Sequence, residues 1–344
     1  MSHLWDEIHE QPRALERLLA RQDAVRSAVR RLRVAEVHYV LIAARGTSDN
    51  AGVYAKYLLG AWNGLPVALA APALFTLYER PPRMAGALVI GISQSGASPD
   101  ICAVVEEARR QGAPTLAITN TPGSRLAQAA EEVIDLCAGP ERSVPATKTY
   151  TAQLLALAMV SALLAGDETR LGALSAVPAA VAETLALNAD LSRLAERYCT
   201  LGDTTVVGRG YNLATALEVA LKIKELTWLG AHPYSAADFR HGPIVVVEQG
   251  YPIVVVAPSG RTFDDMRALV DDLAARGADQ IIISDREEVL AKARTPLRLP
   301  AGIPEWLSPI AAVVPGQLLA VHLAAARGLD PDRPRGLTKV TETR

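Results

Sequence analysis

The chain has 344 residues, half of them hydrophobic, which is enough for one large domain or two ordinary ones. Its 35 lysines and arginines nearly balance its 37 aspartates and glutamates, and only 5% of its residues are aromatic, so neither a nucleic-acid partner nor an anionic membrane is expected. The start of the chain lacks a signal-peptide pattern, and three cysteines without close spacing predict neither disulfides nor a zinc site. We therefore expect a cytoplasmic protein that uses no metal and no organic cofactor.

Short aliphatic runs alternate with helical patterns along the chain, which is typical of an α/β fold with parallel sheets. The first predicted strands and the helices after two of them are Val37–Ala43, Ala51–Leu59, Ala87–Ile92, Pro99–Arg110 and Thr115–Ile118. The apolar stretch Leu154–Ala165 is too short to span a bilayer and predicts a buried core helix. A second set of predicted strands follows at Thr204–Val207, Pro252–Val256 and Gln280–Ile283.

The two sets of strands keep a common register. Four turn motifs recur 164 or 165 positions later: Arg45-Gly46 as Arg209-Gly210, Ser95-Gly96 as Ser259-Gly260, Gly112 as Gly277, and Thr119-Asn120 as Ser284-Asp285. Although α/β proteins reuse strand–glycine–helix turns, four matches at offsets that differ by a single residue indicate an internal duplication. We predict a helical arm at 1–35, a first domain at 36–165, a helical connection at 166–201, a second domain at 202–329 and a tail at 330–344.

Two loops of the first copy are predicted to bind an anion. Ser93, Gln94, Ser95 and Gly96 follow a strand, and Ser98 then precedes Pro99, a favourable first helical residue. The neighbouring strand ends in Gly46, Thr47 and Ser48, again just before a helix. Free N–H groups at the two helix starts and the surrounding hydroxyls suit a phosphate, although serine and threonine can also serve as helix caps alone.

The Ser93–Ser98 loop matches neither a nucleotide-binding P-loop nor the nucleophile elbow of an esterase. A P-loop needs lysine where Ala97 stands, and a nucleophile elbow needs glycine where Ser95 stands. The equivalent loop of the second copy, Ala257–Thr262, keeps one serine and lacks glutamine. We therefore predict no second phosphate there.

The second copy carries the candidate acid–base groups instead. A helix predicted over Leu213–Leu229 places Glu218, Lys222 and Glu225 on one face, and its other faces are apolar. A partly buried Glu-Lys-Glu row shifts its own pKa values, whereas an exposed one would be an ordinary ion-pair stripe. His241 precedes Gly242-Pro243, so we predict it on a turn; no other histidine has metal-ligand spacing with it.

These segments, taken together, resemble the sugar isomerase (SIS) domain family over nearly the whole chain, specifically the isomerase half of glucosamine-6-phosphate synthase and its stand-alone deaminase relatives. The matching segments are Glu7–Pro12, Gly46–Ser48, Ser93–Gly96, Gly139–Glu141, Val144–Lys148, Leu217–Glu225, His241–Pro243, Pro334-Arg335 and Leu337–Thr341. The resemblance implies two tandem flavodoxin-like domains and a sugar phosphate as substrate.

The resemblance also implies a role for each site residue. Gly46, Thr47, Ser48, Ser93, Gln94, Ser95 and Ser98 would hold the phosphate and nearby hydroxyls, with Val144 and Ala146 in a third binding segment. His241, donated by the other subunit of a homodimer, would open the sugar ring. Glu225 would move a proton between C1 and C2, supported by Lys222 and Glu218, and Lys339 would form an imine with the open-chain ketose.

Two departures and one absence bear on the substrate. Ala146 stands where the synthase typically has serine, and Ala237–Arg240 replaces its usual Gly-Glu pair before the histidine. Ser2, rather than a glutaminase cysteine, follows Met1, so we expect ammonia release, from glucosamine 6-phosphate to fructose 6-phosphate. The alternatives are a glutaminase-lacking isomerase or deglycase acting on another amino sugar phosphate, and a non-catalytic sugar-phosphate sensor.

Overall fold

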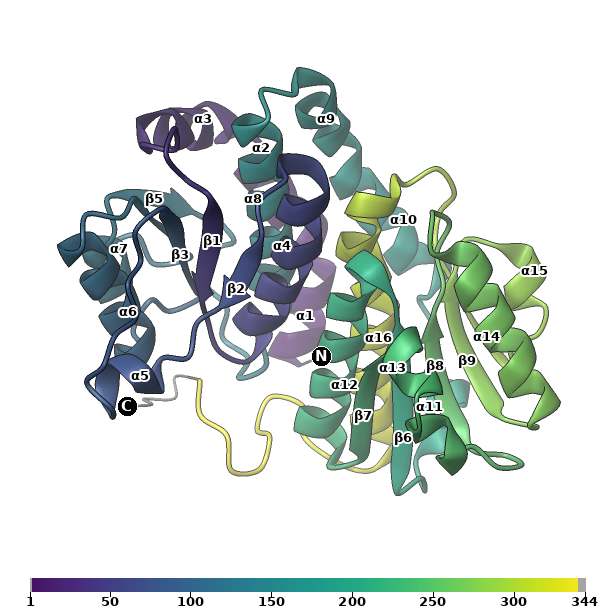
Figure 1. Cartoon of the computed structure of the whole chain (residues 1–344). Helices are drawn as coiled ribbons and strands as arrows, with labels where there is room; N and C mark the ends of the chain where they lie inside the picture. The colour runs from purple at the N-terminus through teal and green to yellow at the C-terminus, as the bar shows by residue number, and fades with distance from the viewer. Residues whose placement is uncertain (1, 340–344) are drawn as a thin grey trace. The chain divides into compact units, whose positions relative to one another are not determined.

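The computed structural model describes residues 2–339. The chain forms two compact units, each of which is made of three segments that are not contiguous in the sequence. The first-repeat unit consists of residues 13–141, 148–176 and 338–339. The second-repeat unit consists of the residues up to Pro12, then 142–147 and 177–337. Figure 1 shows both units with their elements labelled.

The first-repeat unit is built on a five-stranded parallel sheet in the order β2-β1-β3-β4-β5. This is the 2-1-3-4-5 order of flavodoxin-like folds. The strands are β1 (Tyr39–Ala43), β2 (Val67–Leu69), β3 (Ala87–Ser93), β4 (Thr115–Thr119) and β5 (Glu132–Asp135). Strands β3 and β4 are buried along their whole length because both faces of the sheet are covered by helices.

Helices cover each face of this sheet. The helices of this unit are α2 (Gln11–Leu19), α3 (Gln22–Arg31), α4 (Thr47–Asn63), α5 (Ala73–Thr76), α6 (Pro99–Arg110), α7 (Arg125–Ala129), α8 (Lys148–Leu164), α9 (Glu168–Ala173) and the 3-10 turn η1 (Leu174–Ala176). Leu41, Val89 and Ala117 pack against α6 and α7, so the alternate residues of these strands point to the opposite face. Helices α4 and α8 lie on that face (Figure 1).

The second-repeat unit repeats this topology. Its parallel sheet has the order β7-β6-β8-β9-β10, the same as the first when the strands are matched by their place in the chain. The strands are β6 (Asp203–Gly208), β7 (Gly230–Ser235), β8 (Pro252–Val256), β9 (Asp279–Ser284) and β10 (Thr295–Arg298). The duplication and the α/β fold class predicted from the sequence are therefore confirmed.

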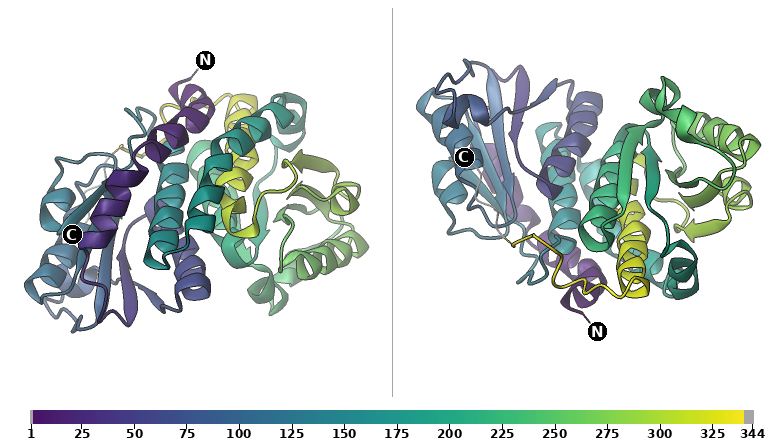
Figure 2. Two further views of the ribbon diagram at one scale, coloured as in Figure 1. Left: turned by 90° about the horizontal axis from the view of Figure 1, so that it is seen from above. Right: turned by 90° about the horizontal axis from the view of Figure 1, so that it is seen from below.

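A buried apolar helix, α16, lies at the centre of the helical layer of the second-repeat unit. Its neighbours α1, α10, α11 and α12 pack around it, and Figure 2 shows it in yellow. Gly316 permits the close approach of α12, because a Cβ atom at Gly316 would lie 2.2 Å from Cγ2 of Val219.

The helices and 3-10 turns of the second-repeat unit are α1 (His3–His9), α10 (Val177–Leu187), α11 (Ser192–Tyr198), η2 (Gly210–Asn212), α12 (Leu213–Thr227), α13 (Ala236–Arg240), η3 (Pro243–Val246), α14 (Phe263–Ala275), α15 (Glu287–Leu290), η4 (Glu305–Leu307) and α16 (Ser308–Ala326).

The predicted central strands and the helix Pro99–Arg110 are confirmed, with shifts of at most two residues at their ends. The strands that sequence patterns missed, β2, β5, β7 and β10, all lie at or next to sheet edges. β7 and β10 contain Pro233 and Pro296, which cannot donate to a ladder and are tolerated at edges. The predicted domain boundaries stay a prediction.

Two helical stretches, Glu168–Leu187 and Glu305–Ala326, are long and apolar enough to cross a membrane by length and composition alone. This is weak evidence, because core helices of soluble proteins pass the same test. In the second stretch, 83% of the apolar window is buried within the protein.

Candidate active site

Two loops of the first-repeat unit end at the same edge of the sheet, after the paired strands β1 and β3. Helix α4 begins directly after Gly46, whose φ of +53° brings the chain sharply into the helix, and no side chain caps its start. Helix α6 begins after Ser98 with Pro99 as its first residue, as predicted, and the Ser98 side chain makes no capping hydrogen bond. Both helix starts therefore present backbone N–H groups and positive dipole ends at the loops.

The serine hydroxyls of these loops are arranged as donors. Ser93 Oγ accepts from the Gly96 N–H (3.1 Å), and Ser95 Oγ accepts from the Ala97 N–H (3.3 Å). Ser48, in the other loop, accepts from Nε2 of Gln153 on α8 (2.9 Å). Because each oxygen already accepts from the protein, its O–H proton can be donated to a bound anion.

An ion pair that sequence analysis missed, with a buried carboxylate and a half-exposed arginine, joins the two loops. Arg45 Nε lies 2.9 Å from Oδ2 of Asp100, whose side chain is fully buried in the first turn of α6. The second repeat has the equivalent pair, Arg209 Nε to Asp265 Oδ2 at 3.1 Å. The signal was present in the sequence, since Asp100 and Asp265 are 165 positions apart, like the glycines Gly112 and Gly277.

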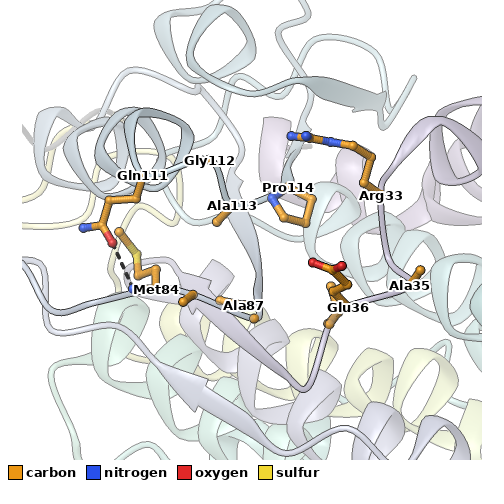
Figure 3. A pocket seen from close by; sticks show the side chains of 12 residues that line it. Arg33, Ala35, Glu36, Met84, Ala87, Gln111, Gly112, Ala113 and Pro114 are labelled. Atoms are coloured by element: carbon orange, nitrogen blue, oxygen red, sulfur yellow. Dashed lines mark hydrogen bonds between the residues drawn. The ribbon is translucent and has the colours of Figure 1, made fainter.

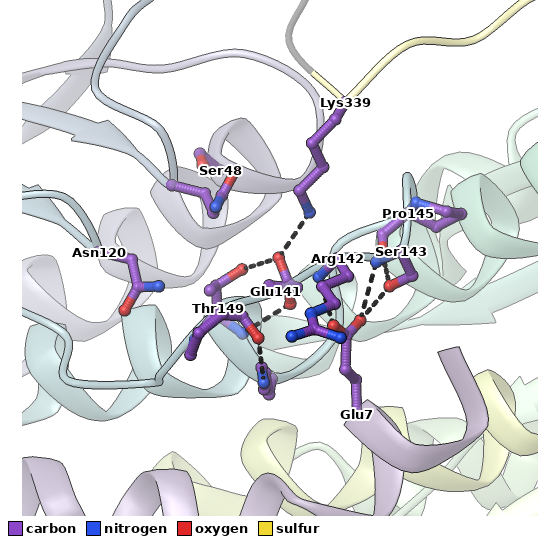
Figure 4. Close-up of polar contacts among 12 residues, drawn as sticks. Glu7, Ser48, Asn120, Glu141, Arg142, Ser143, Pro145, Thr149 and Lys339 are labelled. Atoms are coloured by element: carbon purple, nitrogen blue, oxygen red, sulfur yellow. Dashed lines mark hydrogen bonds and ion pairs between the residues drawn. The ribbon is translucent and has the colours of Figure 1, made fainter. Parts of the chain in front are cut away.

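The tail lysine joins the first-repeat unit through Glu141. Lys339 Nζ lies 3.0 Å from Oε2 of Glu141, whose side chain is fully buried (Figure 4). The same carboxylate accepts from the N–H (3.1 Å) and Oγ1 (2.8 Å) of Thr149 at the start of α8. Val340 and Thr341, also part of the predicted tail, lie outside the described residues.

Helix α8 connects the tail anchor to the anion loops. Thr149, which holds Glu141, and Gln153, which donates to Ser48, are four residues apart and so share one face of the helix. The structure therefore brings Lys339 and the predicted phosphate residue Ser48 to the same side of α8 within one unit.

The acid–base row lies in the second-repeat unit, on α12. Lys222 Nζ is 3.4 Å from Oε1 of Glu218 and 2.5 Å from Oε2 of Glu225. Glu218 and Lys222 are fully buried, whereas Glu225 is 21% exposed and is the member that a substrate can reach. Burial alone would lower the pKa of Lys222, but the two carboxylates outweigh it, so the pKa is raised and the amine stays charged. The shared face predicted for these three residues is confirmed.

His241 also belongs to the second-repeat unit and lies on a turn, as predicted. It caps the short helix α13 and is followed by Gly242, whose φ of +137° favours glycine. Its side chain is exposed, and the apolar residues after it, Val245 and Val246, are 81% and 49% exposed.

The segment that holds Val144 and Ala146 is fixed by a residue outside the predicted set. Glu7 on α1 accepts from the backbone N–H of Arg142 and from the N–H and Oγ of Ser143, as Figure 4 shows. Glu7 is buried, and Val144 and Ala146 are half-buried. Glu7 was part of the family resemblance, but its contact with this segment leaves no local sequence pattern.

Among the described residues, neither a metal-binding cluster nor the pocket described next coincides with these groups. Among residues 2–339, no three histidine, cysteine, aspartate or glutamate side chains are grouped to hold a metal ion. A pocket of about 550 Å³ lies before the strands β1, β3 and β4, at the sheet edge opposite the anion loops (Figure 3). Its lining includes Arg33, Glu36 and Gln111 and none of the predicted site residues.

Comparisons with known proteins show the family to which the chain belongs. Over 97% of its length the chain is 38% identical to glutamine–fructose-6-phosphate aminotransferase (isomerizing) of Thermococcus kodakarensis, of which it spans 56%. Its structure matches the C-terminal domain of glucosamine-fructose-6-phosphate aminotransferase from Francisella tularensis (TM-score 0.88, 27% identity, 97% of this chain and 98% of that one). It also matches a candidate phosphosugar isomerase from Silicibacter pomeroyi DSS-3 (TM-score 0.86, 32% identity, 96% and 100%). The SIS domain family matches twice, at residues 34–163 and 204–327, and the chain belongs to that family as a tandem pair of SIS domains.

Proposed function

We propose that the chain is a phosphosugar isomerase and deaminase that converts glucosamine 6-phosphate and water to fructose 6-phosphate and ammonia. The observation that carries this proposal is the tail amine of Lys339. It is paired with the buried carboxylate of Glu141, which accepts from Thr149 on the same helix, α8, that contacts Ser48. A sensor that only bound a sugar phosphate would need the anion loops but not this amine.

The phosphate binds at the two loops of the first repeat. Thr47, Ser48, Ser93, Gln94, Ser95 and Ser98 surround it with hydroxyl and amide donors beside two helix starts. Gly46 keeps the backbone open at the first loop, because a side chain would be strained at its φ of +53°. Val144 and Ala146 line the sugar with backbone groups, and Ala146 leaves room for a substituent that a serine would contact.

The chemistry divides among three side chains. His241 opens the ring by moving the anomeric hydroxyl proton to the ring oxygen, and Glu225 carries the C2 proton to C1, which leaves a ketimine at C2. Lys339 displaces ammonia from C2 as its own imine, and water then releases fructose 6-phosphate. Lys222 and Glu218 hold the Glu225 carboxylate in position.

The proposed enzyme is a cytoplasmic homodimer in which His241 enters the partner's site. The exposure of His241 and of Val245 and Val246 beside it supports this, since an exposed apolar loop is typical of an interface. Mixing the inactive variants H241N and E225Q tests it. With subunit exchange, one site of each hybrid dimer regains both groups, and activity should return to about a quarter of wild type. No recovery despite exchange would contradict a shared site.

An ammonium-release panel tests the reaction itself. Purified protein is given glucosamine 6-phosphate, other amino sugar phosphates and fructosamine 6-phosphate, and free ammonium or amine is measured. Low free ammonia favours release by mass action, so glucosamine 6-phosphate should yield ammonium and fructose 6-phosphate in equal amounts. Release only from another compound would move the proposal to that substrate, and binding without any release would favour a sensor.

A further inference from the structure

We propose that Glu141 is the base that takes the proton from Lys339 when the tail amine attacks C2 of the sugar, an assignment that rests on the proposed function. C2 is a ketimine during ammonia release and a carbonyl when the enzyme is given fructose 6-phosphate. The two groups are already in contact, with Oε2 of Glu141 3.0 Å from Nζ of Lys339. A lysine amine attacks a carbonyl only after it has lost a proton, so its attack requires an acceptor within hydrogen-bond reach. Glu141 is such an acceptor within the first-repeat unit.

The carboxylate of Glu141 is fixed independently of the tail. The N–H and Oγ1 of Thr149 both donate to it, and it sits at the start of α8, where the helix dipole stabilises a negative charge. Nζ of Lys148 donates to the carbonyl of Pro140 (2.7 Å), which fixes the backbone just before Glu141. Groups other than the tail lysine therefore position the carboxylate that contacts Lys339.

Lys339 and Glu141 together account for every proton that moves in this step. With fructose 6-phosphate, Glu141 accepts a proton from the Lys339 ammonium, and the amine nitrogen adds to the carbonyl carbon to give a carbinolamine. The protonated Glu141 then returns that proton to the carbinolamine oxygen, the C–O bond breaks, and water leaves. The product is an iminium on Lys339 and a carboxylate on Glu141, so no further reactant is needed. During ammonia release the same exchange returns the proton to the departing nitrogen, and ammonia leaves.

Charge balance favours the same assignment. A fully buried carboxylate is costly unless a cation is paired with it. The ammonium before the step and the iminium after it both carry one positive charge on the same nitrogen. Glu141 therefore keeps its partner in both states, and the buried charge is never left alone at either end of the reaction.

Borohydride trapping of the imine tests the role of Glu141. Wild type with fructose 6-phosphate and cyanoborohydride should gain the sugar mass on the peptide that contains Lys339. In E141Q the amide oxygen can still accept from Thr149, but the base is gone, so trapping should slow about 10²-fold at neutral pH. The deficit should shrink as the pH rises, because solvent then removes the proton. E16Q, the same change at an exposed position of α2, should trap like wild type.

The outcomes separate the two proposals. No adduct on Lys339 in wild type would overturn the imine and, with it, the role of Glu141. An adduct that forms in E141Q at the wild-type rate and with the wild-type pH dependence would overturn Glu141 alone. If E141Q does not fold, T149V keeps the carboxylate and removes one of the groups that position it; trapping should then slow several-fold, and unchanged trapping would count against the proposal.

Discussion

The two repeats have the same topology but differ in the polar side chains on their equivalent helices and loops. On α12 of the second repeat, Glu218, Lys222 and Glu225 form the charged row, whereas the positions 164 earlier on α4 of the first repeat are Tyr54, Leu58 and Ala61. Tyr54 and Leu58 are fully buried. The acid–base helix of one repeat is thus a plain core helix in the other.

The loops show the reverse pattern. In the first repeat the anion loop is rich in hydroxyls, and Asn120 stands beside it as a neutral side chain. In the second repeat Ser259 donates through its N–H (2.7 Å) and Oγ (2.6 Å) to Asp285, and Glu305 accepts from Thr262. The second loop therefore already holds two carboxylates, which repel a phosphate. The two repeats share a topology, and under the proposed function the first would bind the phosphate and the second would supply the acid–base groups.

The largest expected effect comes from removing the reachable carboxylate of the charged row. E225Q should lower kcat by about 10³-fold with little change in sugar-phosphate affinity, because the base is lost and the phosphate loops are untouched. Ammonium release and calorimetric binding measure the two quantities. D264N, an exposed carboxylate of the same unit, serves as the control. Normal turnover in E225Q would show that Glu225 is not the base. The charged row on α12 would then no longer distinguish a catalytic second repeat from the first.

The second-largest expected effect is a difference in KM between alanine variants of the equivalent serines Ser95 and Ser259. S95A removes a hydroxyl donor from the proposed phosphate site and should raise KM about 10-fold, since a hydrogen bond to a charged group is worth roughly 1.5–3 kcal/mol. S259A removes a hydroxyl that serves Asp285 and should leave KM unchanged. Steady-state kinetics on both variants provides the check. A KM increase in S259A equal to that in S95A would mean that both loops bind substrate.

The shared Arg–Asp pairs allow a stability comparison. Asp100 is fully buried and Asp265 is 34% exposed, so D100N should cost about 1 kcal/mol of unfolding free energy and D265N less. Urea denaturation of both variants gives the values. D100N should also raise KM, because Arg45 would no longer link the two loops. A larger stability loss in D265N would reverse the expected order.

The smallest expected effect is on the pH dependence of stability, through His322 on the core helix α16 of the second repeat. Burial lowers the pKa of His322 on α16, while Asp190 opposes and His9 reinforces this; α8 has no histidine. Because the folded pKa lies below the unfolded value of 6.5, the neutral form's stability is present above pH 6.5 and is lost as pH falls through the folded pKa. H322N should flatten that loss by about a few tenths of a kcal/mol, measured as unfolding free energy from pH 7 to 5. An unchanged pH slope would exclude His322 as its source.

The sequence predicted the buried parts of this molecule better than its edges and long-range contacts. Central strands such as Pro252–Val256 were found because burial on both faces leaves a continuous apolar run. Edge strands such as β7, with Pro233 and half-exposed positions, leave no such run. The pair Arg45–Asp100 and the contact of Glu305 with Thr262 join residues 55 and 43 positions apart, and no local pattern records them. The roles of the site residues remain proposals.

A crystal structure with an open-chain polyol phosphate, which lacks a carbonyl and cannot react, tests the division between the repeats most directly. We predict one phosphate per chain, bound by the Ser93–Ser98 and Thr47–Ser48 loops, with Glu305 still in contact with Thr262. A phosphate in the Ala257–Thr262 loop, or none at Ser93–Ser98, would contradict it.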